Sequence, residues 1–487
     1  MGTWQLDALC PRAILNDRTE SRRSTVMAGE PITSASVASV QAQQVKHEVR
    51  KGAWLALIML CLVYVLNFLD RQLLSILSKP IQDELHLTDG QLGLLGGLYF
   101  AAFYCTISLP IAWLADRHNR VRIVGAACTL WSAATIACGL ARTYPELAVA
   151  RMSVGVGEAG GVPPSYSIIA DYFPADKRGM AYGIYNLGPP IGQALGVAFG
   201  ASVAATYSWR DAFIVLGVVG VAAGIAVFLF VREPKRGALD KAPVAAPPPI
   251  DPALPIPPAT KRVGFWKTFG MFLSRPILLL VALAAAATQF ITYAVLNFTT
   301  LFLMREKGMT LEEVAVWYAI LIGLGIGAGV FLSGWLVDRL APKSQRAYAL
   351  LPAVALTVAA PLFVAFVWAP DWPTALLFLA LPTALNYFFL SPAVALVQAK
   401  VEPEQRTLAG AILLLIMNMV GLGFGPTYLG AMSDMFSSQG HQNPLQLAFY
   451  TLTPFYLLAI VMHLFLARAL GREEKAALAT HPAPNQG

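Results

Sequence analysis

Long apolar runs recur along almost the whole chain, and short polar segments separate them. Each run is about 20 residues long, which is the length an α-helix needs to cross the ~30 Å hydrocarbon core of a bilayer. The pattern predicts an all-α integral membrane protein with twelve spanning helices, at residues 53–78, 90–114, 121–141, 146–172, 178–205, 211–231, 276–304, 311–337, 346–369, 373–399, 406–433 and 445–469.

A proline- and alanine-rich stretch, PKRGALDKAPVAAPPPIDPALPIPPATKR, separates the sixth predicted helix from the seventh. This composition is typical of a semi-extended linker and not of a spanning helix. We therefore expect five parts, which are an N-terminal cytoplasmic tail (1–52), a six-helix bundle (53–231), a cytoplasmic linker (232–275), a second six-helix bundle (276–470) and a C-terminal cytoplasmic tail (471–487).

The composition and the placement of charge agree with this class. Only 13% of the residues are charged and 56% are hydrophobic, whereas soluble proteins carry about 25% charged residues. On one side of the predicted membrane the loops hold only Lys79, Arg142, Arg210, Arg305 and Lys307 of the 35 Lys and Arg residues. The positive-inside rule then places both termini and the linker in the cytoplasm. This topology explains the net charge of +7 without a nucleic-acid partner.

The two halves of the chain repeat each other. The stretch AWLADRHNR (112–120) follows the second predicted helix, and GWLVDRLAP (334–342) follows the eighth. A similar match links PSYSIIADYFPADKRGMAYGI (164–184) with PAVALVQAKVEPEQRTLAGAI (392–412). A six-helix unit duplicated in parallel orientation is the architecture of a two-domain transporter, whose substrate site lies between the halves near the bilayer midplane.

The repeated loops are similar to the signature loop of the major facilitator superfamily. The resemblance implies that an acidic residue at the end of a helix, with nearby basic residues, latches the cytoplasmic side. It assigns this gating role to Asp116, Arg117 and Arg120 in the first copy and to Asp338 and Arg339 in the second. The stretch RMSVGVGEAG resembles the fourth-helix motif of the superfamily, and GPPIG resembles a motif associated with antiporters.

Within the superfamily, the chain looks like a bacterial member of the spinster family of proton-coupled lipid transporters. The segments NFLDRQLLSIL, GEAGGVPPSY and YFPADKRGMAYGIYNLGPPIG carry this resemblance. It implies alternating access in a bacterial inner (plasma) membrane. It also implies an amphipathic lipid substrate, such as a lysophospholipid or a sphingosine-phosphate-like molecule. The alternative is a proton-coupled carrier of organic anions such as sugar acids, or a multidrug exporter of the same superfamily.

Four ionisable residues lie deep in the predicted helices of the first half, namely Asp70, Arg71, Arg151 and Glu158. Such residues are costly in a bilayer and usually face a cavity. Adjacent residues on a helix point about 100° apart, so Asp70 and Arg71 cannot face the same partner, whereas Arg151 and Glu158 share one face. We therefore predict a charge cluster across the first and fourth helices.

The cluster suggests a coupling device. A carboxylate that meets its arginine in only one state binds a proton in the other. We predict that Asp70 and Glu158 carry protons, with Arg71 as their switchable counter-ion. Arg151 would position Glu158 or hold an anionic headgroup. The alternative for each residue is a permanent structural salt bridge that does not titrate.

Neutral polar residues complete the predicted substrate site. The expected substrate contacts, besides Arg151, are Asn67 in the first helix and Gln289, Thr292, Asn297 and Asn386 in the second half. Each could instead make a helix-packing hydrogen bond. His463 is expected to lie at the periphery.

The sequence argues against an enzyme. Of its six histidines only His463 lies in a predicted span, and it has no phosphate-binding GxxxxGK loop, which also excludes ATP-driven transport. The chain has five cysteines, an odd number that cannot all pair, and no CxxC motif, so we expect neither disulfides nor a metal site. We expect no cofactor, since a proton gradient supplies the energy. The expected partners are the amphipathic substrate and the lipid bilayer, and the protein is predicted to be a monomer.

Overall fold

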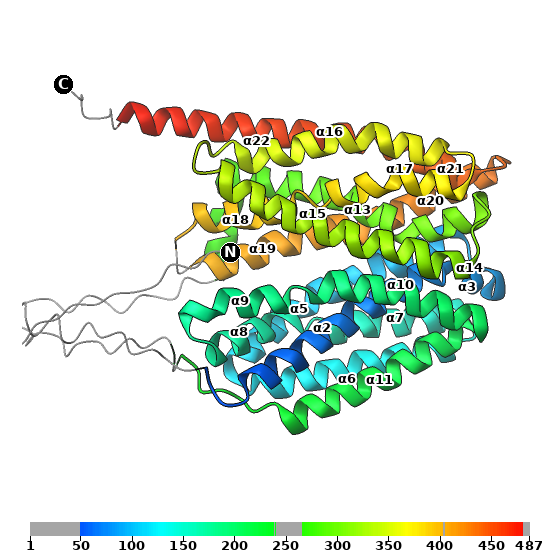
Figure 1. Ribbon diagram of the computed structural model, residues 1–487, viewed down its shortest axis with the longest axis horizontal. Coiled ribbons are helices and arrows are strands. Elements are labelled where there is room, and N and C mark those ends of the chain that lie inside the picture. The colour runs from blue at the N-terminus through cyan, green and yellow to red at the C-terminus, as the bar shows by residue number, and fades with distance from the viewer. Residues whose placement is uncertain (1–48, 238, 240–264, 403–404, 481–487) are drawn as a thin grey trace, which may run out of the picture. The chain divides into compact units, whose positions relative to one another are not determined.

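The computed structural model describes residues 49–237, 239, 265–402 and 405–480, and these residues are folded almost entirely into helices (Figure 1). They belong to one compact unit. The predicted tails, apart from their described ends, and most of the predicted linker lie outside these ranges. The predicted boundary between two six-helix bundles remains a prediction. We call the described residues up to 239 the N-terminal half and those from 265 onward the C-terminal half.

The N-terminal half contains ten helices within its described residues. They are α2 (Ala53–Ile76), α3 (Ser78–Leu85), α4 (Asp89–Gly96), α5 (Leu98–Arg117), α6 (Arg120–Leu140), α7 (Tyr144–Glu158), α8 (Val162–Tyr172), α9 (Ala175–Tyr185), α10 (Gly188–Thr206) and α11 (Trp209–Phe230).

The C-terminal half contains thirteen helical segments within its described residues, two of them π-helical. They are α12 (Phe265–Ser274), α13 (Pro276–Glu306), α14 (Leu311–Glu313), η1 (Val314–Tyr318), α15 (Ala319–Leu340), α16 (Ala347–Trp368), α17 (Trp372–Leu385), α18 (Leu390–Lys400), α19 (Arg406–Met417), η3 (Asn418–Phe424), α20 (Gly425–Ser438), α21 (Pro444–Tyr450) and α22 (Thr453–Thr480).

Ten helices among the described residues are long and apolar enough to cross a membrane, and they match ten of the twelve predicted spans. The other two predictions, 146–172 and 178–205, coincide with pairs of shorter helices. The first is divided between α7 and α8 at residues 159–161, just before Pro163 and Pro164. The second is divided between α9 and α10 at Asn186 and Leu187, just before two further prolines. Proline lacks the amide hydrogen that a continuous helix requires, so these sequences favour a break.

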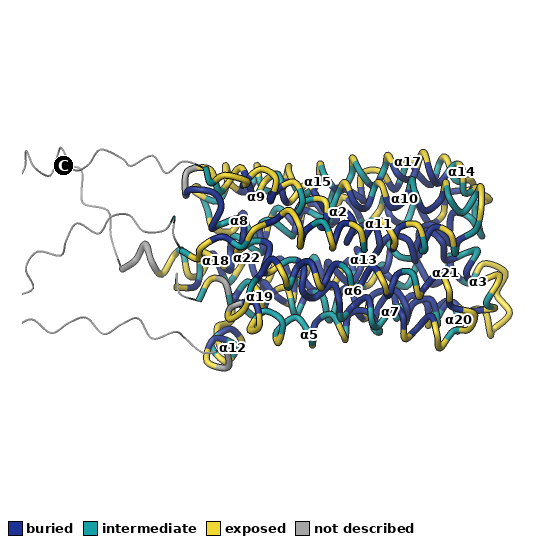
Figure 2. Tube along the Cα trace, turned by 90° about the horizontal axis from the view of Figure 1, so that it is seen from below, coloured by how far each residue is buried: buried dark blue, intermediate teal, exposed yellow. Residues whose placement is uncertain are grey.

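Apolar side chains cover much of the outer surface of the helices. Leu324, Phe331, Trp368 and Leu377 are each at least 70% exposed, and Figure 2 shows buried residues along the interior of the assembly with exposed residues on its outer turns. Large exposed apolar surfaces on helices of this length indicate contact with lipid. The chain is therefore a multi-pass integral membrane protein.

The start of α2 and the end of α22 lie at the same end of the helices, which the charge distribution assigns to the cytoplasm (Figure 1). The opposite end holds α3, α14 and α21, and we call it the periplasmic end, after the bacterial inner membrane that the sequence analysis predicts. At this periplasmic end the two halves meet, because α4 packs against α20, α3 against α13, and α10 against α14 and η1. At the cytoplasmic end, α8 and α9 pack against N-terminal helices, and α18 and α19 against C-terminal ones. The structure is thus closed at its periplasmic end.

Small residues let α10 approach α2 closely. Gly188, Gly192, Gly196 and Gly200 recur every four residues along α10, and each lies against a side chain or the backbone of α2. At Gly196 a Cβ atom would lie 2.8 Å from the Cβ of Gln72, which is closer than real Cβ atoms approach. The stripe of glycines therefore serves close packing, as small residues commonly do between membrane helices.

We expect Gly196→Ala to destabilise the protein, because the added methyl group must push α10 away from α2. Overpacking of this kind typically costs about 1–3 kcal/mol of the free energy of unfolding. The measurement is the thermal unfolding midpoint of the purified protein in detergent. Gly183→Ala in α9 is the matched control, because a Cβ there meets no atom within 4 Å and alanine favours helix. Equal midpoints for the two variants would show that the α2–α10 contact is not tight.

Candidate functional site

Arg71 and Glu158 form a buried ion pair between α2 and α7. The Arg71 Nε donates to Glu158 Oε2 at 2.6 Å. The Glu158 side chain is fully buried, and only 13% of the Arg71 side chain is exposed. The predicted pairing of Arg71 with Glu158 is therefore present in the structure.

Aromatic rings surround the Arg71 guanidinium. Its central carbon lies 5.0 Å from the ring centres of Phe68 and Phe100 and 4.8 Å from that of Tyr104. An aromatic face attracts a cation, and the attraction is stronger where water is excluded. The rings stabilise the positive charge without neutralising it. Arg71 can therefore remain charged when its carboxylate partner does not.

Asp70 and Arg151 form the second buried pair. The Arg151 Nη1 lies 3.4 Å from Asp70 Oδ2, and each side chain is only 2% exposed. The Thr135 hydroxyl on α6 donates to Asp70 Oδ1 at 2.8 Å. As predicted, Asp70 and Arg71 have separate partners. Arg151 was expected to position Glu158 or to hold an anionic headgroup. Its ion-pair partner in the structure is Asp70, and both expected roles remain predictions.

Two glycines of α7 bring the charges into the protein interior. A Cβ at Gly155 would lie 2.7 Å from the carbonyl oxygen of Phe100 on α5, and one at Gly157 would lie 2.6 Å from the backbone nitrogen of Trp131 on α6. Only glycine permits such close backbone approach. The RMSVGVGE segment therefore holds α7 tightly against α5 and α6, with Arg151 and Glu158 facing α2.

A cavity lies beside this charge cluster (Asp70, Arg71, Arg151 and Glu158) and between the two halves. Both arginines line it, together with other residues of α2, α4, α5 and α10. The C-terminal half contributes residues of α13 and η3. The remaining lining residues are Phe68, Gln72, Ser75, Gly96, Phe100, Gln193, Tyr293, Leu296, Asn297 and Leu422. Two guanidinium groups in one enclosed space form a site suited to an anion.

Several polar atoms near the cavity lack a hydrogen-bond partner. Among the described residues these include Glu158 Oε1, Arg151 Nε, Gln72 Nε2 and Asn67 Oδ1, all buried. A buried polar atom without a partner is costly. The charge cluster is thus incompletely satisfied by the protein itself, and it has acceptor and donor capacity available for a proton, a water molecule or a substrate.

The neutral residues that were predicted to contact the substrate do not all line the cavity. Asn297 lines the cavity. Gln289 instead donates to Asn418 at 2.9 Å, Thr292 to the Thr288 carbonyl at 2.9 Å, and Asn386 to the Tyr456 hydroxyl at 2.9 Å. For these three residues the structure therefore contains the hydrogen bonds between or within packed helices that were the alternative to substrate contact. Their role in substrate binding remains a prediction.

His463 lies in the interior of the C-terminal half and not at its periphery. It is only 2% exposed, and its Nε2 lies 3.1 Å from the Thr288 hydroxyl. The sequence could not reveal this, because a lone histidine in an apolar helix gives no sign of which face it occupies.

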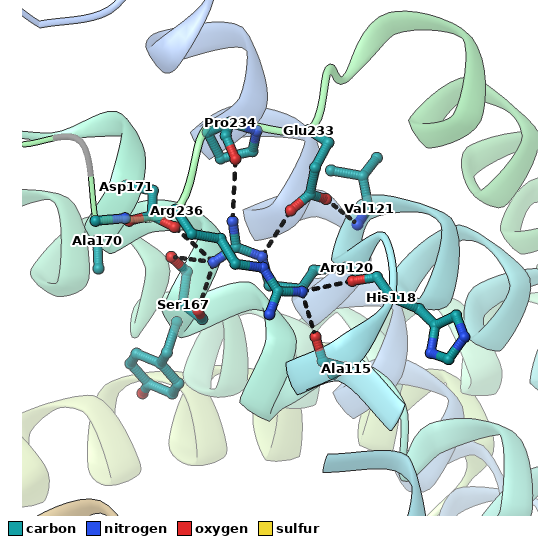
Figure 3. A network of polar contacts seen from close by, with 12 residues as sticks. Ala115, His118, Arg120, Val121, Ser167, Ala170, Asp171, Glu233, Pro234 and Arg236 are labelled. Atoms are coloured by element: carbon teal, nitrogen blue, oxygen red, sulfur yellow. Dashed lines mark hydrogen bonds and ion pairs between the residues drawn. The ribbon is translucent and has the colours of Figure 1, made fainter. Parts of the chain in front are cut away.

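Arg120 braces the cytoplasmic end of the N-terminal half. Its guanidinium donates to Glu233 at 2.7 Å, to Asp171 at 2.6 Å and to the Ser167 hydroxyl at 2.6 Å (Figure 3). All of these partners belong to the same half. Arg120 therefore ties the segment after α11 to α6 and α8, and its predicted gating role remains a prediction.

The other predicted gating residues sit at two equivalent helix ends. The central carbon of Arg117 lies 3.8 Å from the ring centre of Trp113 on α5, and Arg339 lies at the same distance from Trp335 on α15. Asp338 is exposed. The backbone of Asp116 belongs to α5, but its side chain lies outside the described part of the structure. The internal repeat is thus preserved in side-chain geometry.

A group of contacts that the sequence analysis did not identify joins the halves at the periplasmic end. Arg305 at the end of α13 donates two hydrogen bonds to Asp89 at the start of α4, at 2.9 and 2.7 Å. Ser433 on α20 donates to the same carboxylate at 2.5 Å. Paired parallel bonds between an arginine and a carboxylate are among the strongest polar contacts in proteins.

Asp434 adds a second connection at this end. Its carboxylate accepts hydrogen bonds from the backbone N–H groups of Asp89 and Gly90, both at 2.9 Å. These are free amides of the first turn of α4, where the helix dipole favours negative charge. A residue of one half thus caps a helix of the other. We call Asp89, Arg305, Ser433 and Asp434 the periplasmic cluster.

Only weak signals in the sequence point to the periplasmic cluster. Arg305 was visible as one of the few basic residues on the periplasmic side, and Asp89 follows Thr88, which caps α4. Both are ordinary features of helix ends. Asp89 and Asp434 are 345 positions apart in the chain, so no local pattern pairs them.

Comparisons with known proteins identify relatives of the chain. A family profile described as Major Facilitator Superfamily matches residues 60–366. The chain is 32% identical to an "MFS-type efflux pump" of Mycolicibacterium smegmatis over 402 residues, 82% of this chain and 89% of the relative. It is 28% identical to the "Hexuronate transporter" of Bacillus subtilis over 290 residues, 59% of this chain and 66% of the relative.

A solved structure is also similar. It is a crystal structure of a bacterial homologue of the human lysosomal transporter Spinster, in an inward-facing and unoccupied conformation. The match has a TM-score of 0.77 and 28% sequence identity, and it covers 87% of this chain and 99% of the other. An inward-facing state agrees with the closed periplasmic end of the structure described above.

We expect Asp89→Asn and Asp434→Asn to favour opening of the periplasmic end, because each removes charge from bonds that cross between the halves. Losing one partner of a buried charge pair costs at least about 2 kcal/mol, so Asp89→Asn should raise the open fraction more than tenfold relative to the closed one. Asp434→Asn weakens a helix cap, which is worth about 1 kcal/mol, and should raise the open fraction severalfold. The measurement is the distance distribution between spin labels at residues 83 and 439 in a cysteine-free background.

Asp371→Asn is the matched control for this prediction. Asp371 also caps a helix at the periplasmic end, by accepting from the Thr374 amide at 2.9 Å, but within its own half. It should leave the distance distribution unchanged. An identical distribution for all three variants would contradict a gating role for the periplasmic cluster.

Proposed function

The chain belongs to the major facilitator superfamily and is a membrane transporter, and we propose that protons drive its transport by alternating access. The observation that carries this proposal is the charge cluster, in which two carboxylates and two guanidiniums are buried together beside a cavity between the halves. Buried ionisable groups in membrane helices commonly belong to ion pathways and proton relays.

Glu158 is the preferred proton carrier. One of its oxygens accepts from Arg71, but Oε1 is buried without a hydrogen-bond partner. A proton placed on this carboxylate would remove its charge and release the ionic hold on Arg71. The surrounding rings would then hold the guanidinium. Arg71 is thereby free to engage a substrate anion.

Asp70 is the second proton carrier in this proposal. Its two oxygens are engaged by Thr135 and Arg151, so it is better satisfied than Glu158. We infer that it exchanges its proton after Glu158, when a rearrangement within the N-terminal half loosens the contact between α2 and α7. Protonation of Asp70 releases Arg151, which also lines the cavity.

The proposed substrate is an amphipathic anion, such as a lysophospholipid or a sphingosine-phosphate-like molecule. Arg71 and Arg151 supply the anion site. The other side of the cavity, formed by Tyr293, Leu296 and Leu422 among others, is largely apolar and carries no charged residue. A small hydrophilic anion would find few polar partners on that side, namely Asn297 and the Tyr293 hydroxyl. The resemblance of the sequence to the spinster family, which implies a lipid substrate, favours the same class.

The second candidate is an organic-anion carrier for compounds such as sugar acids. The similarity to a hexuronate transporter favours it, and two cavity arginines suit a carboxylate equally well. A multidrug exporter is the third candidate, by similarity to an efflux pump. For all three we propose a monomer in a bacterial inner membrane.

Purified protein in liposomes with an imposed pH gradient tests the function. The panel comprises a lysophospholipid, a sphingoid phosphate, a sugar acid and a cationic drug, each followed in both directions. Movement of the lysophospholipid or the sphingoid phosphate that collapses with a proton ionophore would support the proposal. Movement of the sugar acid or the drug alone would select the corresponding alternative.

We expect Glu158→Gln to reduce substrate accumulation driven by the pH gradient at least tenfold. Exchange of substrate across the membrane should continue. Glutamine keeps the shape and can accept a bond from Arg71, but it cannot carry a proton. The paired measurements are gradient-driven uptake and counterflow in the same liposomes. Asp70→Asn should behave similarly. Because this variant leaves Arg151 without its partner, its thermal unfolding is measured first.

Glu84→Gln is the control for these variants. Glu84 is a carboxylate at the periplasmic end that pairs with Arg210 at 2.6 Å, away from the cavity. It should leave both uptake and counterflow unchanged. Full gradient-driven accumulation by Glu158→Gln would instead favour the permanent salt bridge, with no titration.

A further inference from the structure

A row of aromatic rings begins at Arg71 and runs toward the cytoplasmic end of the N-terminal half. Tyr64, Phe68 and Arg71 lie at spacings of four and three on α2 and so share one face of this helix. The rings of Tyr64 and Phe68 meet edge to face, with centres 5.4 Å apart. Because Phe68 and Arg71 line the cavity between the halves, Tyr64 continues that face toward the cytoplasm.

The row continues from α2 onto α8 and α9, which pack against it. Tyr64 stacks on Tyr185 at 4.5 Å, and Tyr185 meets Tyr166 edge to face at 5.2 Å. Tyr166 in turn lies 5.4 Å from Tyr182. Tyr185 is buried behind the others, whereas Tyr64, Phe68, Tyr166 and Tyr182 are half-buried. We call these four half-buried residues the aromatic track.

Neighbouring residues fix the rings in place. A Cβ at Gly188 would lie 2.9 Å from a ring carbon of Tyr64, so the first glycine of the GPPIG segment makes room for that ring. The Tyr166 hydroxyl donates to Asn186 at 2.6 Å, and the Tyr182 hydroxyl to the Tyr166 carbonyl at 3.4 Å. The track is therefore a preformed surface, which binds at a lower entropic cost than a flexible one.

The chemistry of the track suits a hydrocarbon chain. Its rings offer large apolar faces, and the hydroxyl groups of Tyr166 and Tyr182 are hydrogen-bonded to the protein. None of the four residues carries a charge, in contrast to the guanidiniums at the end of the row that lies beside the cavity. A molecule that used the whole surface would have an anionic group at one end and a long apolar chain at the other.

We propose that the aromatic track binds the apolar chain of the substrate, with the headgroup at Arg71 and Arg151 and the chain directed toward the cytoplasmic end. This inference rests on the proposed function for the class of substrate. It adds the orientation of the molecule, the residues that contact its chain and a selection for chain length.

The geometry separates a near and a far part of the track. Tyr64 lies seven residues from Arg71, which corresponds to about 10 Å along a helix rising 1.5 Å per residue. Phe68 and Tyr64 therefore contact the first part of any chain. Tyr166 and Tyr182 lie beyond Tyr64 in the row, so only a long chain reaches them. Each methylene group that gains contact strengthens binding roughly threefold to fourfold.

The test is binding of hexyl phosphate and hexadecyl phosphate to the full-length protein in phosphatidylcholine nanodiscs. Wild-type protein should bind the long compound more tightly. The double variant Tyr166→Ala with Tyr182→Ala should lose at least tenfold in affinity for hexadecyl phosphate and less than twofold for hexyl phosphate. Partition of the probes into lipid cancels, because all variants are compared in the same nanodiscs.

Two further variants separate the track from a general loss of structure. Tyr166→Phe with Tyr182→Phe keeps the rings and should bind both compounds within twofold of the wild type. Arg71→Gln should weaken both compounds by similar factors. Unchanged hexadecyl phosphate binding by the alanine variant, or an equal loss for the short compound, would overturn the proposal.

The outcome does not depend on proton coupling, because binding is measured without a gradient. Absence of gradient-driven uptake by the wild type would overturn the proposed function while leaving the chain-length result standing. A wild-type protein that binds the two phosphates equally well would overturn the track alone.

Discussion

The pairing of two buried carboxylates with two buried guanidiniums is the constraint on which the rest of the structure depends. Charges inside a membrane protein persist only with partners, since isolated ones are too costly. Arg71 with Glu158 and Asp70 with Arg151 hold α2 against α7. The glycines of α7 bring the charges inward, and the rings around Arg71 stabilise its cation. The cavity lies beside these pairs, in which Glu158 Oε1 and Arg151 Nε lack a hydrogen-bond partner.

Charged side chains form contacts between the halves at the periplasmic end, whereas at the cytoplasmic end Arg120 forms contacts within one half. At the periplasmic end, Asp89, Arg305 and Asp434 form bonds that cross between the halves. At the cytoplasmic end, Arg120 bonds only within its own half. Charged contacts between halves thus lie where the protein is closed, and charged contacts within a half brace the end where it is not. A change of state has to break the first set.

Membrane class, helix positions and the charge cluster followed from the sequence because each depends on local pattern. Apolar runs of a fixed length are hard to mistake, and Asp70, Arg71, Arg151 and Glu158 stood out in an apolar background. The specific pairing of Arg151 with Asp70 was not predictable, because side chains from three helices determine it. The periplasmic cluster joins residues more than 200 positions apart, and its members resemble ordinary helix caps.

The breaks in the two discontinuous spans bear on how the chain enters the membrane during synthesis. The helix α7 carries Arg151 and Glu158, and neither α7 nor α8 is among the helices long and apolar enough to cross a membrane alone. Insertion of charged residues is unfavourable for an isolated segment. Their entry therefore depends on neighbours already in place, of which α2 presents the matching charges Asp70 and Arg71. The residues proposed for proton coupling are thus also the charges with which α7 pairs when it packs against α2.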